Sequence, residues 1–262
     1  MESREIKCLM TNALNLGEEM LKCGAEVSRV EDALQRIFLS YGANDVDVLT
    51  ITSCIVLTVT FSEKDTFTQT RRIRNANIDF ARLSELNALS REICATTPAA
   101  DKIRERLDGI LKAPSSPRKR LLKTCVGAVL AAGGFAVFFG GSLADFLAAA
   151  PVALLIVAFE RFFKRSDANL PAYYFFCSLC AGLAVQVLCA LFPAALNQSR
   201  LMISFIMLVI PGMAFTNSAR DFLMGDTISG SLRLLESVLY AACIAGGVAV
   251  SLLLTGAGGV KL

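Results

Sequence analysis

The stretch that decides the fold runs from Leu208 to Glu236 and reads LVIPGMAFTNSARDFLMGDTISGSLRLLE. An apolar run enters this stretch from Leu201, and Pro211 and Gly212 interrupt it. If Leu201 begins a helix at one bilayer face, Pro211 lies roughly 15 Å further on, near the middle of a hydrocarbon core about 30 Å thick. A Pro-Gly break inside a spanning helix frees backbone groups that can bind a ligand. The break therefore predicts that this stretch is the functional part of a membrane transporter.

Charged residues follow the break, and a second apolar run follows them. Charges between two membrane-length segments are costly unless they face protein or water, so they mark a candidate site. The candidate substrate-binding or gating residues are Pro211, Gly212, Asn217, Arg220, Asp221, Asp226, Ser229, Arg233 and Glu236. We expect the two arginines to attract an anionic carboxylate, and the acidic residues to balance them or to carry a coupling proton. The alternative is a salt-bridged loop that fixes the helix ends.

The composition separates the chain into two parts. The 262 residues are 54% hydrophobic with a mean hydropathy of +0.55, which is too apolar for an average soluble protein. Most acidic residues lie in residues 1–117, whereas residues 118–262 are nearly free of charge outside short basic flanks. This pattern predicts a small α+β domain over 1–117, followed by a helical membrane bundle over 118–262. MESREIKCLM has no apolar segment behind its charges, so we expect no cleavable signal sequence.

Cysteine and histidine usage limits the chemistry that the chain can perform. Nine scattered cysteines do not form a disulfide framework, and the CxxC of Cys177 and Cys180 lies within an apolar helix, where packing is the simpler role. There is no histidine, so a Ser-His-Asp triad or a zincin site is excluded for this chain. We expect no metal site, no cofactor and no nucleic-acid partner.

Periodicity predicts the elements of the first domain. Helical spacing runs from Ile6 to Leu21 and again from Val27 to Phe38. Alternating β-branched segments predict an antiparallel meander of three strands, at Asp45–Ile51, Ser53–Phe61 and Thr66–Ile73, with a polar turn at 63–65. Two further helices are expected, one over Asp79–Cys94 and one from Pro98 to about Leu111.

The caps and inward faces of these helices can also be predicted. Ser28 and Glu31 have the spacing of a capping box. Thr97 is expected to cap the last helix of the domain. Phe80, Leu83, Leu86 and Ile93 are expected to face inward from the helix over Asp79–Cys94.

A second charged cluster opens the helix at Val27. The sequence GAEVSRVED brings together Glu26, Arg29, Glu31 and Asp32. Two interpretations are open: a solvated helix start with intrahelical ion pairs, or a regulatory or substrate-gating surface.

Five membrane spans are expected. They are roughly 124–139, 143–159, 171–192, 201–216 and 234–254, with a tight turn at Gly140-Gly141 between the first two. One side of the membrane would hold Arg118, Lys119, Arg120, Lys123, Arg161, Lys164, Arg165, Arg220 and Arg233; the other would hold only Arg200 and Lys261. The positive-inside rule therefore places the first domain in the cytoplasm and the C-terminus outside.

Three segments together resemble the threonine/serine exporter (ThrE-like) family. They are GEEMLKCGAEVSRVEDAL, YGANDVDV and PGMAFTNSARDFLMGDTISGSLRLLES, and the resemblance covers about residues 10–255. The chain is most similar to the separate five-span subunit with a cytoplasmic N-terminal domain (YjjP-like). Thr52 and Ser53 stand where the family has a Pro-Thr pair, which weakens any role for that turn.

The resemblance implies export of small carboxylated metabolites across the bacterial inner membrane. The substrates would be threonine and serine in full-length members and succinate in the split system. It also implies a YjjB-like small membrane subunit as partner, in an oligomeric complex. The alternative hypothesis is a regulatory or sensor subunit whose cytoplasmic domain binds a metabolite while a partner protein transports the substrate. A membrane hydrolase using Ser229 or Asp226 is disfavoured, because no histidine and no Gly-x-Ser-x-Gly elbow are present, and no enzyme activity is expected.

Overall fold

The computed structural model describes residues 3–62, 65–73, 78–112, 117–163 and 169–256. The chain forms two compact units. The first comprises Met1–Pro114 and Thr216–Leu234, and the second comprises Ser115–Phe215 and Leu235–Leu262. Residues 216–234, which the sequence places between the last two expected membrane spans, therefore pack with the amino-terminal residues.

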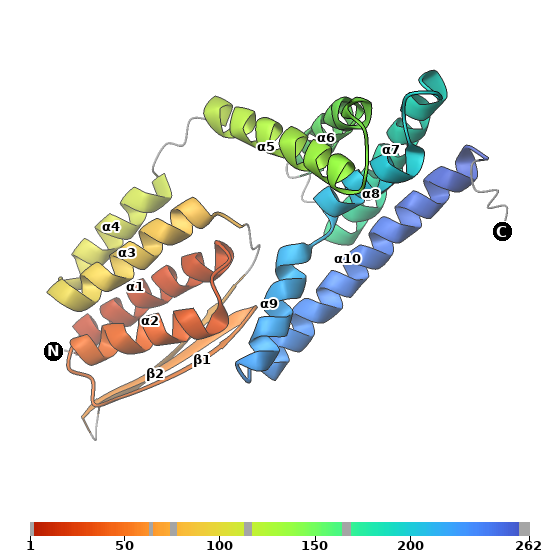
Figure 1. Ribbon diagram of the computed structural model, residues 1–262. Helices are drawn as coiled ribbons and strands as arrows, with labels where there is room; N and C mark the ends of the chain where they lie inside the picture. Colours follow the sequence, from red (N-terminus) through yellow and green to blue (C-terminus); the bar gives the residue numbers. More distant parts are fainter. Residues whose placement is uncertain (1–2, 63–64, 74–77, 113–116, 164–168, 257–262) are drawn as a thin grey trace. The chain divides into compact units, whose positions relative to one another are not determined.

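The first unit is a small α+β domain, as predicted. Its amino-terminal part contains α1 (Ser3–Lys22), α2 (Val27–Ser40), β1 (Asp45–Ile51), β2 (Cys54–Ser62), β3 (Asp65–Arg72), α3 (Phe80–Thr96) and α4 (Ala100–Lys112), and residues 216–234 add two helical segments. The strands form one antiparallel sheet in the order β1-β2-β3 (Figure 1), which confirms the expected meander. Glu63 and Lys64 of the expected turn lie outside the described residues.

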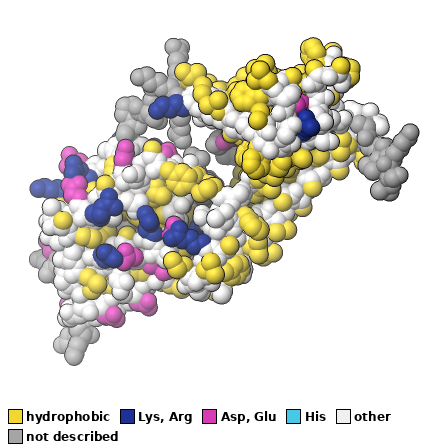
Figure 2. Space-filling view, in the orientation of Figure 1, with side chains coloured by type: hydrophobic (Ala, Val, Ile, Leu, Met, Phe, Trp, Pro, Cys, Tyr) yellow, Lys and Arg dark blue, Asp and Glu magenta, His cyan; other side chains and the backbone are white. Residues whose placement is uncertain are grey.

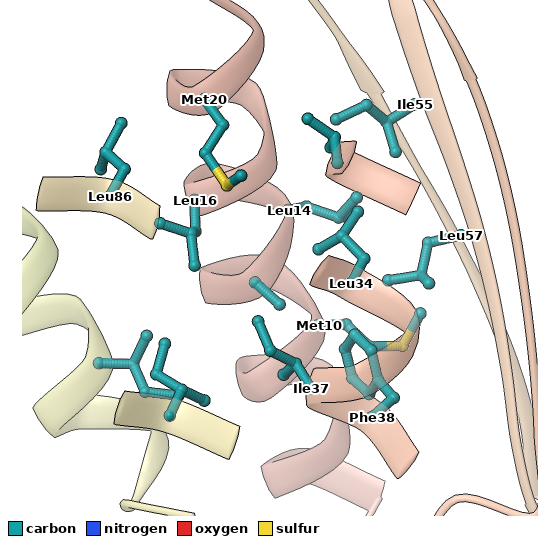
Figure 3. Close-up of a cluster of buried hydrophobic side chains, with 14 of the residues drawn as sticks. Met10, Leu14, Leu16, Met20, Leu34, Ile37, Phe38, Ile55, Leu57 and Leu86 are labelled. Carbon is teal, nitrogen blue, oxygen red and sulfur yellow. The ribbon is translucent and has the colours of Figure 1, made fainter. Parts of the chain in front are cut away.

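The core of this domain forms because each element carries an apolar stripe of the matching period. Met10 and Leu14 of α1 lie beside Phe38 and Leu34 of α2, and Leu57 of β2 borders the same cluster (Figure 3). All five side chains are almost completely buried. Alternation along β2 buries every second residue, so the opposite face of the sheet carries its threonines. The apolar pattern alone thus fixes which face of each element points inward.

Three local predictions are wrong. Helix α2 begins at Val27 with Glu26 in the N-cap position, so Ser28 lies inside the helix and forms no capping box with Glu31. Thr97 ends α3 in the left-handed conformation (φ 39°) and does not cap α4, which begins at Ala100. Phe80 is 53% exposed, because it is the first residue of α3 and precedes the buried stripe.

The second unit is a bundle of apolar helices. Its helices are α5 (Pro117–Phe138), α6 (Leu143–Phe163), α7 (Leu170–Leu191), α8 (Gln198–Val209), the first residues of α9 (Gly212–Leu223) and most of α10 (Thr227–Leu254). The basic run at 118–123 belongs to α5, while Lys164, Arg165 and Lys261 lie outside the described residues. The fold class, a helical membrane bundle preceded by an α+β domain, is confirmed.

Four helices of the described chain are long and apolar enough to cross a membrane. They are Leu121–Phe138 within α5, then α6, α7 and α10; the bent pair α8 and α9 makes a fifth span if it crosses as one. Hydrophobic side chains cover most of the visible face of this unit, whereas charged side chains are spread over the first unit (Figure 2). The turn before α6 is tight as expected, with Gly140 at φ 84°. Pro151 lies within α6, which continues past it.

Polar and small residues hold these apolar helices together. The Ser204 hydroxyl of α8 donates to the Ala132 carbonyl of α5 at 2.6 Å. The Gln186 amide of α7 donates to the Ser251 hydroxyl of α10 at 3.3 Å. Asp145 is buried and accepts backbone N–H groups from Ser142 and Asn197, both at 2.8 Å. Such contacts replace the hydrophobic driving force that is absent between helices in lipid.

Gly247 should be intolerant of any side chain. A methyl group at this position of α10 would fall on the carbonyl oxygen of Phe175 and the hydroxyl of Ser178, both in α7. We expect Gly247→Ala to cost about 1–3 kcal/mol through overpacking, measured as a lower unfolding temperature in detergent. Gly246→Ala is the matched control: its methyl group would lie 3.5 Å from Phe175, an ordinary contact. Equal unfolding temperatures for the two variants would contradict the close α7–α10 approach.

Candidate functional site

The Pro-Gly break separates two short helices. Pro211 has no backbone N–H and cannot continue α8, which ends at Val209. The N–H of Gly212 donates instead to the carbonyl of Ile210 at 2.8 Å, and α9 starts at Gly212 with its axis bent by 55° from α8. The predicted interruption at Pro211 and Gly212 is therefore present, within the second unit.

Two glycines shape the turn between α9 and α10, which belongs to the first unit. Gly225 adopts φ 92°, a conformation that side chains disfavour, and the N–H of Asp226 donates to the Asp221 carbonyl at 2.9 Å. A methyl group at Gly230 would lie 3.1 Å from the Ser218 carbonyl oxygen and from the Phe222 ring. The two helices thus form a closely packed hairpin over residues 216–234.

A buried ion pair ties this hairpin together. The Arg233 Nε of α10 lies 3.3 Å from the Asp221 Oδ2 of α9, with side-chain exposures of 15% and 5%. Removing one partner of such a pair leaves an uncompensated buried charge, which is strongly destabilising. For these two residues the geometry fits the predicted salt bridge that fixes helix ends.

A second ion pair joins the hairpin to the amino-terminal domain. The Arg220 Nη1 donates to the Glu26 Oε1 at 2.7 Å, and the two residues are 194 positions apart in the chain. Arg220 is 49% exposed and Glu26 is 22% exposed, so this pair is accessible to solvent. The fold therefore unites the two charged clusters that the sequence singled out separately.

Glu31 adds a third carboxylate to this region. Its Oε1 accepts the backbone N–H of Thr50 at 2.7 Å. Burial raises the pKa of Glu31; the Thr50 N–H opposes the shift, and the negative charges of Asp226 and Asp47 reinforce it. The Asp226 charge also acts on Asp221, as do the charges of Glu26 and Arg220. The Arg220–Glu26 and Asp221–Arg233 ion pairs thus lie in a region that holds further negatively charged side chains.

The remaining predicted site residues are not members of these two ion pairs. Arg29 is exposed, and Asp32 pairs with Arg36 of its own helix at 2.8 Å, so both fit the solvated helix start. Ser229 is buried at the beginning of α10, which does not suit a nucleophile. Asn217 is partly buried on α9. Pro211, Gly212 and the exposed Glu236 belong to the second unit.

Two supporting residues were not anticipated. Ser218 is buried on α9, and its carbonyl faces Gly230. Thr50 supplies the N–H that holds Glu31. The spacing of small residues Ser218, Gly225 and Gly230 signals a close helical hairpin, whereas nothing local marks Thr50. Within the described ranges, no group of three or more His, Cys, Asp or Glu side chains is arranged to hold a metal ion.

Sequence comparison assigns the chain to a family. The family described as a putative threonine/serine exporter matches residues 12–255, which include the whole candidate site. The chain belongs to the threonine/serine exporter family. This confirms the resemblance based on the sequence motifs, and it places the α8–α9 break and the charged hairpin within an exporter family.

Two relatives match nearly all of this chain but only about half of their own length. It is 28% identical to a probable threonine/serine exporter of Mycobacterium tuberculosis (strain ATCC 25618 / H37Rv), over 91% of this chain and 45% of the relative. It is 23% identical to the threonine/serine exporter of Corynebacterium glutamicum, over 96% of this chain and 52% of the relative. The chain thus spans about half the length of these relatives. No solved structure matches it significantly.

The raised pKa of Glu31 predicts a pH-dependent stability difference. A carboxyl group whose pKa is higher in the folded state is favoured when protonated, so its ionisation removes stability as pH rises through that raised value. Glu31→Gln keeps an acceptor for the Thr50 N–H and removes the charge. We expect this variant to unfold at a higher temperature than the wild type at neutral pH, with the difference vanishing in acid below the ordinary pKa of glutamate.

Thermal unfolding of the purified chain in detergent at several pH values measures this difference. Glu31→Ala is the control, because it removes both the charge and the acceptor and should lower stability. A Glu31→Gln variant that is less stable than the wild type at neutral pH would contradict the assignment.

Proposed function

We propose that this chain is one half of an exporter of small carboxylated metabolites in the bacterial inner membrane. Threonine and serine are the first candidate substrates, and a dicarboxylate such as succinate is the second. The observation that carries the proposal is the family match along residues 12–255. A transport role, not a hydrolytic one, also suits the buried position of Ser229.

Arg220 is the residue proposed to receive the substrate carboxylate. It is half-exposed, whereas Arg233 is nearly buried and already pairs with Asp221. Guanidinium groups bind carboxylates with two parallel hydrogen bonds, which gives both strength and orientation. Deeper groups would come from Asn217 and from the backbone at the α8–α9 break.

Acidic residues of the hairpin are proposed to carry a coupling proton. Asp221 is the strongest candidate, because its Oδ2 is buried and accepts no hydrogen bond from the described residues. Its contact with Arg233 would loosen on protonation and so link proton binding to the α9–α10 packing. Asp226 and Glu236 are the alternative carriers.

The proposed orientation places the amino-terminal domain and the hairpin in the cytoplasm and the C-terminus outside. The Lys and Arg distribution supports this arrangement. The Arg220–Glu26 contact supports it as well, because both residues then face the same compartment.

A separate YjjB-like membrane subunit is proposed to supply the missing half, in an oligomeric complex. One structural observation supports it. An apolar groove of about 330 Å³ runs between Ile206 of α8 with the following Ile210 and Ala241, Ala245 and Ala249 of α10. The alanines recur every four residues, which allows close approach of a partner helix.

A second candidate function is regulation. The Arg220–Glu26 contact joins the amino-terminal domain to the hairpin, so a metabolite that binds this domain would alter the hairpin directly. In this alternative the chain is a sensor, and its partner alone transports.

Efflux measurements separate these functions. Cells would be loaded with radiolabelled serine, threonine or succinate and would express the chain with or without the candidate partner. We expect efflux only with both chains, and Arg220→Ala should abolish it while the complex still assembles. Efflux from the chain alone would refute the two-component exporter. Efflux that persists in Arg220→Ala would favour the sensor, and loss of the complex would favour a structural role for Arg220.

Filling the α8–α10 groove should block assembly. Ala245→Phe places a bulky ring on the groove floor, and we expect the partner to be lost in affinity co-purification. Val238→Phe is the matched control, since Val238 is exposed on α10 but does not line the groove. Equal loss of the partner in both variants, or in neither, would exclude the groove as its docking site.

A further inference from the structure

The hydrogen bond between Arg220 and Glu26 uses only part of the hydrogen-bonding capacity of the two side chains. One guanidinium N–H and one carboxylate oxygen form the contact. A guanidinium carries five donors, and a carboxylate has two acceptor oxygens. With exposures of 49% and 22%, both groups keep access to solvent. The pair therefore holds two opposite charges that a small ligand can reach.

The Glu26 side chain also does not make the capping hydrogen bond that is usual at its position. It is the N-cap residue of α2, with φ −71° and ψ 147°, yet its side chain forms no capping hydrogen bond. Acidic N-cap residues normally accept an N–H from their own helix. Here the carboxylate extends to α9 of the hairpin, so moving it breaks no bond within α2.

The charges around the pair discriminate between ligands. Glu31, Asp221 and Asp226 supply three further carboxylates, and Arg233 is engaged by Asp221. This surrounding opposes any additional net negative charge and favours a positive group near Glu26.

We propose that Glu26 and Arg220 together form a loading site for a zwitterionic α-amino acid. The α-carboxylate binds Arg220, and the α-ammonium group binds Glu26. The assignment rests on the proposed export function and adds to it a specificity-determining residue from the amino-terminal domain.

The need to keep each charge paired explains which ligands the site prefers. A zwitterion that enters between the two side chains gives each of them a new partner of opposite sign. A monocarboxylate or dicarboxylate satisfies Arg220 alone and leaves Glu26 unpaired in the field of the Asp221 carboxylate, which costs binding energy. The site therefore prefers serine or threonine to succinate.

Opening the pair requires only side-chain movement. Arg220 is long and half-exposed, and the Glu26 side chain forms no capping hydrogen bond with its own helix. The hairpin itself remains closed by Asp221–Arg233 and by the close approach at Gly230. Loading thus replaces one ion pair by two and leaves the packed residues in place.

Binding to the purified chain in detergent tests the proposal. Isothermal titration calorimetry would compare L-serine, propionate, which has only the carboxylate, ethanolamine, which has only the ammonium group, and succinate. We expect the wild type to bind serine more tightly than any of the other three. Glu26→Gln keeps the shape of the contact and should weaken serine binding at least about tenfold. Propionate binding should instead become tighter, because the variant leaves no unpaired carboxylate when Arg220 binds the ligand.

The matched control breaks a similar pair elsewhere in the same domain. Arg106 and Glu92 form an exposed ion pair between α4 and α3, so Glu92→Gln should leave serine binding unchanged. The serine-to-propionate ratio is the decisive readout, because a role of Glu26 in folding alone would lower both affinities together.

Several results would overturn the proposal. They are no serine binding by the wild type, succinate binding as tight as serine binding, and a Glu26→Gln variant whose serine-to-propionate ratio equals that of the wild type. The exporter proposal fails separately: cells that export no label while the binding ratio depends on Glu26 would refute export and leave this site intact.

Discussion

Because Pro211 has no backbone N–H, it determines how the segment from α8 to α10 is arranged. Helix α8 cannot continue through this residue, so α9 restarts at Gly212 with a bend of 55°. In hydrocarbon, unpaired peptide groups are tolerated only where protein, water or a ligand covers them. The break therefore converts one long apolar segment into two short helices. The charged residues lie on the second of them, in the turn that follows and on the first part of α10.

The two ion pairs of the hairpin differ in burial and so in what they can do. Asp221 and Arg233 are nearly buried, which makes their contact a constraint on α9 and α10. Arg220 and Glu26 are accessible, which leaves their charges available for exchange. Gly225 and Gly230 make this division possible, because one permits the turn and the other lets the helices approach. A stable hairpin can then present a pair that opens.

The membrane unit combines close internal packing with a largely apolar exterior. Gly247 allows α10 to contact the α7 backbone, and Ser204 and Gln186 add hydrogen bonds between helices. Long apolar side chains such as Leu235 and Leu253 of α10 remain exposed. Lipid solvates such surfaces as well as protein does, so helix contacts depend on small and polar residues. The alanine-floored groove beside α10 has that composition.

Local pattern was sufficient for most elements and for the break. Period-2 and period-3.6 repeats predicted the sheet and its core helices, and Pro211 predicted the interruption, because both depend on neighbouring residues. Helix starts were less predictable: Thr97 ends α3, and Ser28 lies inside α2, since several nearby residues can cap a helix. The sequence identified the charged clusters at 26–32 and 217–236 but not their partners. Only the tertiary fold paired Glu26 with Arg220 and buried Asp221 against Arg233, because ion pairs across 194 residues depend on how the elements pack.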